Sequence, residues 1–144
     1  MSSNHASPIE YGAPIALQLA RDVAAAAESH ARERGWPMVI AVVDSGGTLV
    51  LLHKMDHAQI GSVAVAQAKA QSAVRFKRPT KVFEDALAAG GLAWRLLATE
   101  AACPLEGGLP LMRDGRLIGA IGVSGMTSTQ DAEAAAAGAD RLSG

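Results

Sequence analysis

Two glycine-rich segments joined by a tight turn constrain the fold of this chain more than any other feature. They are residues 106–111 (Glu-Gly-Gly-Leu-Pro-Leu) and 119–125 (Gly-Ala-Ile-Gly-Val-Ser-Gly). Asp114-Gly115 lies between them, and Asp-Gly between two apolar runs indicates a hairpin because glycine accepts the positive φ of a two-residue turn. Glycine at 119, 122 and 125 marks a bulge or a close approach to the backbone. We therefore predict a hairpin with a glycine-lined surface that faces a ligand or another subunit.

The rest of the sequence alternates helices with one further hairpin. Two hairpins separated by helices cannot form an all-parallel sheet. The prediction is an α+β fold in which helices pack on an antiparallel, profilin-like or PAS-like sheet of two hairpins. In chain order we expect a helix over 14–34, strands over 38–43 and 48–53, a helix over 58–76 stopped by Pro79, a shorter helix capped by Thr80, the glycine-rich hairpin, and a helix that begins after Ser128-Thr129 and runs to about 142.

Length, charge and cysteine content exclude several classes of protein. The 144 residues fit one domain, which we expect over 11–144 after a flexible tail over 1–10, with Tyr11 mobile. The net charge of −1 and the absence of a Lys/Arg block argue against nucleic-acid binding. The single cysteine excludes an internal disulfide. Because neither a signal peptide nor a membrane span is visible, we expect a cytoplasmic protein with no membrane contact.

The composition also favours self-association. Aromatic residues make up only 3% of the chain, while alanine and glycine are abundant. Small side chains bury little apolar area, and each Å² contributes only about 25 cal/mol. We expect a homo-oligomer, in which subunit contacts bury the additional surface.

Several blocks spread along the chain resemble one known family. Over about Ile15–Gly138 the chain is similar to the GlcG/HbpS-like family, long catalogued as a domain of unknown function. The resemblance implies a profilin-like α+β domain, symmetric oligomers, and relatives that bind haem or are encoded beside glycolate oxidase. Besides the two glycine-rich segments and Asp131, the matching blocks are 42–47 (Val-Val-Asp-Ser-Gly-Gly), 55–58 (Met-Asp-His-Ala), 68–70 (Ala-Lys-Ala) and 76–80 (Phe-Lys-Arg-Pro-Thr).

The resemblance makes haem the first ligand to consider. Haem needs an axial ligand and an apolar slot. His53 and His57 are the candidate iron ligands, although histidines in a connection are commonly ordinary exposed residues. Cys103 is expected to pack as a small apolar side chain. We expect haem or another small ligand between the glycine-rich hairpin and segment 53–69, held by His53, His57, Thr80, Gly107, Gly108, Ser124 and Gly125.

An enzymatic alternative rests on different residues. In a small catabolic tautomerase, deaminase or hydrolase, Glu106 or Asp56 would move a proton on an unsaturated acid or imine. Lys69 and the amides of Gly107 and Gly108 would hold the anion, although Lys69 also fits a solvated helix position. A third possibility is a binding module whose ligand modulates a partner. No phosphate loop or dinucleotide fingerprint is present, so we expect no nucleotide cofactor.

Overall fold

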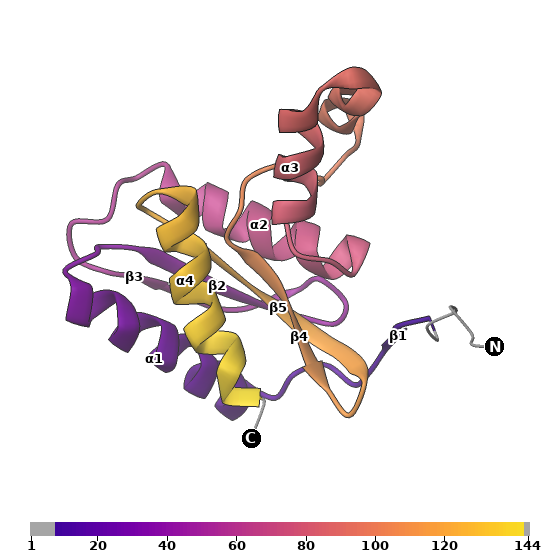
Figure 1. The fold of residues 1–144 in the computed structure, drawn as a ribbon. Helices are drawn as coiled ribbons and strands as arrows, with labels where there is room; N and C mark the ends of the chain where they lie inside the picture. Colours follow the sequence, from indigo (N-terminus) through magenta and orange to yellow (C-terminus); the bar gives the residue numbers. More distant parts are fainter. Residues whose placement is uncertain (1–7, 143–144) are drawn as a thin grey trace.

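A computed structural model describes residues 8–142 of the chain (Figure 1). Its elements are β1 (Glu10–Tyr11), α1 (Leu17–Arg34), β2 (Val39–Asp44), β3 (Leu49–Lys54), α2 (Ser62–Phe76), α3 (Lys81–Ala89), the 3-10 helix η1 (Gly91–Ala98), β4 (Gly108–Arg113), β5 (Arg116–Ser124), α4 (Ser128–Ala139) and the 3-10 helix η2 (Asp140–Leu142). Within residues 8–142, no helix combines the length and the apolar character that a membrane crossing requires.

The central strand of the five-stranded sheet is β5. It pairs antiparallel with β2 and with β4, and its first residues pair in parallel with β1. Strand β3 pairs antiparallel with β2. The backbone φ angles of Asp114 and Gly115 are 53° and 76°, as a two-residue hairpin turn requires. Both predicted hairpins and the mostly antiparallel α+β class are therefore confirmed, and the short parallel strand β1 is an addition.

Helices cover both faces of this sheet. Side chains of α1 and α4 pack on one face around Ile40 and Ile121, and those of α2 pack on the other face around Val43 and Ala120. In Figure 1, α1 and α4 lie in front of the sheet and α2 lies behind it, while α3 and η1 project away from the body. The buried faces of the helices consist mainly of alanine, which lets them approach the strands closely.

The glycines of the hairpin mark these close approaches. A Cβ on Gly122 would overlap the carbonyl oxygen of Ala66 in α2, and a Cβ on Gly108 would overlap that of Lys69. A Cβ on Gly125 would lie 2.6 Å from the carbonyl oxygen of Pro37. The predicted close approach is confirmed. The predicted surface open to a ligand or another subunit is wrong, because the chain's own backbone covers it.

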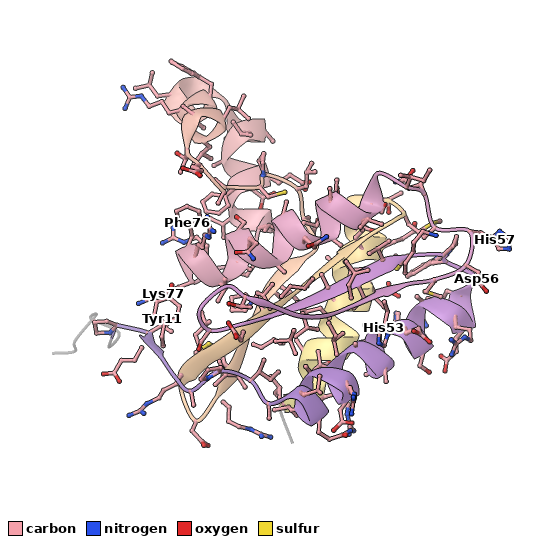
Figure 2. All side chains as sticks on the ribbon, turned by 180° about the vertical axis from the view of Figure 1, so that it is seen from behind. Tyr11, His53, Asp56, His57, Phe76 and Lys77 are labelled. Atoms are coloured by element: carbon pink, nitrogen blue, oxygen red, sulfur yellow. The ribbon has the colours of Figure 1, made fainter. Side chains whose placement is uncertain are left out.

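The start of the described chain is fixed rather than mobile. The Tyr11 hydroxyl donates a hydrogen bond to the Val74 carbonyl over 2.7 Å, and the Lys77 ammonium lies 4.8 Å from the centre of the Tyr11 ring (Figure 2). The expected mobility of Tyr11 is therefore wrong. Residues 1–7 of the predicted tail lie outside the described residues, and Glu10 of that tail pairs with Arg116 in the sheet.

Thr80 has a different role from the predicted helix cap. Its hydroxyl makes no capping hydrogen bond to α3. Instead, it accepts a hydrogen bond from the Gly108 amide over 2.9 Å, and the Thr80 amide donates to the Gly108 carbonyl over 3.0 Å. Thr80 thus fixes the beginning of β4. Helix α2 ends three residues before Pro79, at Phe76, because Lys77 adopts a left-handed conformation with φ 56°.

A charged cluster between α1 and α4 leads to a prediction about acid stability. His30 Nε2 lies 2.6 Å from Glu133 Oε2, and Arg34 Nε lies 2.9 Å from the same oxygen. The hydrogen bond with His30, followed by the charge of Arg34, lowers the pKa of Glu133 below its ordinary value of 4.5. A carboxyl whose pKa is lower in the folded state stabilises the fold above its unfolded pKa, and loses that contribution as the pH falls through the folded pKa.

We therefore expect the wild type to lose stability relative to Glu133→Gln as the pH falls below about 4.5. Urea midpoints measured for both proteins from pH 7 down to pH 3 test this expectation. The difference should be modest because the Glu133 side chain is 47% exposed. Parallel pH dependence in the two proteins would contradict it.

Candidate functional site

The structure divides the predicted site residues between two places. One is an open cavity where α1 and β3 end, and the other is the buried contact of α2 with β4, β5 and α4. The predicted single site between the hairpin and segment 53–69 is thus not one cavity. Asp56 and His57 line the cavity, whereas Lys69, Thr80, Gly107, Gly108 and Ser124 belong to the buried contact.

The open cavity, here called the α1–β3 cavity, has a volume of about 500 Å³. The left-handed Gly35 ends α1 there and turns the chain into β2. Antiparallel pairing of Val39 with Lys54 then brings the residues before β2 beside those after β3. The walls carry both apolar and charged groups: Glu28, Arg32, Gly35, Trp36, Pro37, Lys54, Met55, Asp56 and His57.

The two candidate histidines are held differently. His57 is exposed, has φ 70°, and its imidazole has no hydrogen-bond partner among the described residues. His53 Nδ1 lies 3.0 Å from Glu28 Oε1, and its side chain is 35% exposed. Figure 2 shows Asp56 and His57 at the outer end of the connection from β3 to α2, at the same end of the molecule as His53. Only His57 borders the cavity directly.

The pairing of His53 with Glu28 has a known counterpart in metal sites. A metal-binding histidine commonly donates its second ring N–H to a carboxylate, which fixes the ring orientation. Glu28 also forms an ion pair with Arg32 on the next turn of α1. The carboxylate therefore connects His53 to the wall of the α1–β3 cavity.

Lys69 and Asp131 form a buried ion pair behind the hairpin. Lys69 Nζ lies 2.9 Å from Asp131 Oδ2 and donates to the Val123 carbonyl, also over 2.9 Å. Their side chains are only 2% and 4% exposed. Burial raises the pKa of Asp131 even though the Met126 amide and Lys69 favour its charged form. The alternative of a solvated Lys69 is wrong, since its ammonium joins α2 to β5 and α4.

The remaining candidates make hydrogen bonds within the protein. The Gly107 carbonyl accepts from the Val123 amide over 3.0 Å, and the Ser124 hydroxyl donates to that of Ser62 over 3.1 Å. The Gly108 amide is already bonded to Thr80, so it does not present a donor to an anion. The Glu106 amide donates to Glu84 Oε1 over 3.1 Å. Of the groups proposed for acid–base chemistry, Asp56 lines the α1–β3 cavity, whereas Lys69 and the Gly108 amide are bonded inside the protein.

A second cavity, of about 460 Å³, lies between α2 and the segment that leads to β4. Burial raises the pKa of the Cys103 thiol on its wall, so this thiol is protonated at neutral pH. The expected apolar packing of Cys103 agrees with its burial. The other wall residues are Ala68, Gln71, Arg75, Glu100, Ala101, Ala102 and Pro104.

Sequence reasoning missed most wall residues of the α1–β3 cavity, among them Arg32, Trp36 and Lys54. A signal for them was present. The predicted end of the first helix at residue 34 and the predicted first hairpin together place residues 35–37 beside residues 54–57. Each feature is local in the sequence, whereas the cavity arises only where the two meet.

Similar proteins of known sequence or structure cover most of this chain. The Escherichia coli K12 protein GlcG is 38% identical over 110 residues, which are 76% of this chain and 81% of GlcG. The crystal structure of Klebsiella pneumoniae ORFY superposes with a TM-score of 0.85 at 33% identity and covers 99% of this chain and 98% of ORFY. The structure of the PduOC–haem complex gives a TM-score of 0.79 at 27% identity, over 88% of this chain and 93% of PduOC.

The family match has the same extent. Residues 15–140 match the family described as "Haem degrading protein HbpS-like", which spans α1 to the end of α4 and both cavities. This match confirms the resemblance found in the sequence blocks. The chain belongs to the HbpS-like family.

Proposed function

We propose that this protein binds haem in the α1–β3 cavity, with His57 as the axial ligand of the iron. The observation that carries the proposal is the unpartnered imidazole on the wall of a cavity of about 500 Å³. Histidine is a common axial ligand of haem iron. The haem complex of the related PduOC and the haem-degrading description of the family support this choice of ligand.

The other walls of the cavity fit the two kinds of surface that haem presents. Trp36 and Met55 are half-buried and pack against the main core, so they offer a fixed apolar wall to the macrocycle. Arg32 and Lys54 are cations suited to the carboxylate groups at the haem edge. Lys54 has no ion-pair partner among the described residues and is the freer of the two.

Bound haem would supply an iron centre whose redox potential and reactivity depend on its axial ligand, hydrogen bonding and solvent exposure. The protein's part is to hold it. His57 would provide the ligand nitrogen, and Trp36 and Met55 would exclude water from one face of the macrocycle. The acid–base alternative has less support, because Lys69 and the Gly108 amide are already bonded within the protein.

Titration of the purified protein with haemin, followed by absorbance, tests the proposal. We expect a saturable, stoichiometric Soret shift in the wild type. His57→Ala should weaken haem binding by at least about tenfold and alter the spectrum, because the iron loses its protein ligand. His53→Ala and Cys103→Ser are the matched controls, one beside the cavity wall and one in the second cavity. Both should retain stoichiometric binding and the wild-type spectrum.

Each contrary outcome identifies a different error. If His53→Ala alone loses the Soret shift, the axial ligand is His53, the histidine held by Glu28, and not His57. Loss in Cys103→Ser alone would move the site to the second cavity. A wild type with only weak, non-stoichiometric binding would overturn the haem proposal as a whole.

A further inference from the structure

The helical projection over Lys81–Glu100, here called the α3–η1 arm, is attached to the body only at its base (Figure 1). Phe83 is the one buried residue of its two helices, and its ring packs edge-on against Phe76 with the ring centres 5.5 Å apart. Beyond Phe83, no residue of α3 or η1 is buried. Leu92 and Trp94 are each 61% exposed, and Leu97 is 69% exposed.

An exposed group of this kind needs an explanation. Single exposed apolar residues are common on monomers, but a cluster of large ones marks an interaction surface. Tryptophan in particular is enriched among the residues that contribute most to binding energy at interfaces. Trp94 and Leu97 lie in an eight-residue 3-10 helix with no buried residue, although such helices rarely exceed four residues. A partner that covers this face would stabilise the helix.

The charges of the arm show which partner fits. It carries two cations against three carboxylates, so it lacks the basic excess of a membrane-surface or nucleic-acid-binding helix. Lys81 pairs with Asp85 over 3.1 Å, and Glu84 accepts from the Glu106 amide. Within residues 8–142, this leaves the side chains of Arg95 and Glu100 with neither an ionic nor a hydrogen-bonding partner. These two charges of opposite sign stand on either side of Leu97.

We propose that the α3–η1 arm is a self-association surface that packs against the arm of a second copy about a twofold axis. A twofold contact uses the same patch on both subunits, so the patch must be complementary to itself. Antiparallel arms centred near Leu97 meet this condition. Each Arg95 then faces the partner subunit's Glu100, while Trp94 and Leu97 are buried between the arms. This proposal names a surface for the homo-oligomer that the composition led us to expect, and it shares no residue with the α1–β3 cavity.

Sedimentation velocity of the full chain over a concentration series tests the arm. Trp94→Ala should raise the dissociation constant of the oligomer by at least about tenfold, since a central buried tryptophan is a typical hot spot. Ile60→Ser is the matched control, because Ile60 is 87% exposed and lies outside the arm. It should associate as the wild type does. Circular dichroism should show both variants folded, since neither side chain is buried.

Charge reversal gives a second, independent readout. Arg95→Glu and Glu100→Arg should each weaken association by placing like charges together, and the double variant should restore it. A wild type that is monomeric at all concentrations would remove self-association altogether. If the oligomer is unaffected by Trp94→Ala and by charge reversal, the chain self-associates through another surface, and the proposed role of the α3–η1 arm is wrong. A monomer that instead binds lipid vesicles through Trp94 would make a membrane the partner and also overturn the proposal.

Discussion

Replacing Gly122 with alanine is expected to destabilise the fold by more than about 3 kcal/mol, or to prevent folding. The new Cβ would overlap the Ala66 carbonyl and lie 2.6 Å from the Ala70 amide nitrogen in α2. Both obstacles are backbone atoms, so no change of rotamer relieves the overlap. β5 cannot move away either, because it is hydrogen-bonded to β2 on one side and to β4 on the other.

Gly61→Ala is the control for this experiment. A Cβ at Gly61 meets no atom within 4 Å, and φ there is −60°. Its unfolding free energy should stay within about 0.5 kcal/mol of the wild type. Urea or guanidinium unfolding of the three proteins gives the comparison. If Gly122→Ala were as stable as Gly61→Ala, the close contact of α2 with the sheet would be wrong.

Replacing Lys69 with methionine is expected to lower the unfolding free energy by about 3–5 kcal/mol near neutral pH. Methionine fills a similar volume, so the loss comes mainly from the charge. The Asp131 carboxylate would remain buried with no cation beside it, and the Val123 carbonyl would lose its donor. Burial already raises the pKa of Asp131, and removing Lys69 raises it further.

The pH dependence of this deficit has a definite sign. A carboxyl whose pKa is higher in the folded state binds its proton more tightly there, so stability falls as the pH rises through the folded pKa. The deficit of Lys69→Met should therefore be largest near neutral pH and shrink towards acid. Adding Asp131→Asn should recover part of the loss at pH 7, because no buried charge remains. Lys54→Met, at an exposed lysine with no ionic partner among residues 8–142, should show neither effect. Equal deficits at pH 7 and pH 4 would contradict this account.

The fold was predictable because its signals are local. Asp114-Gly115 specified one hairpin. The loop after β2 turns by a different local device, in which Asp44 Oδ1 accepts hydrogen bonds from the Gly46 and Thr48 amides. Helix α1 ends at Arg34, as predicted, because Gly35 adopts the left-handed conformation that glycine allows. Thr80 was misjudged, since its hydroxyl is used by Gly108, a residue 28 positions away. Local capping rules do not anticipate such a competing partner.

The site was harder to predict for two physical reasons. The Lys69–Asp131 pair joins residues 62 positions apart. Helix α2 is so rich in alanine that its apolar pattern does not distinguish a buried face from a solvated one, and Lys69 therefore also fitted a solvated position. The α1–β3 cavity forms only where the end of α1 lies beside the end of β3, and these two ends are far apart in the sequence. His57 was named as a candidate from the family blocks, whereas its neighbour Trp36 follows only from the register of β2 and β3.

The central position of β5 has a consequence for how the protein is made. This strand is the last of the sheet to leave the ribosome. Its neighbour β2 is synthesised much earlier, and α2, α3 and η1 are made between the two strands. Until β5 emerges, α2 cannot pack against Gly122. The Lys69 ammonium also lacks both of its partners, the Val123 carbonyl and the Asp131 carboxylate. A nascent chain can form the β2–β3 hairpin and pack α1 against it, but α2 then lacks the contact with β5 that covers much of its apolar face. We therefore expect the packing of α2 against the sheet to form late in synthesis, after β5 has emerged.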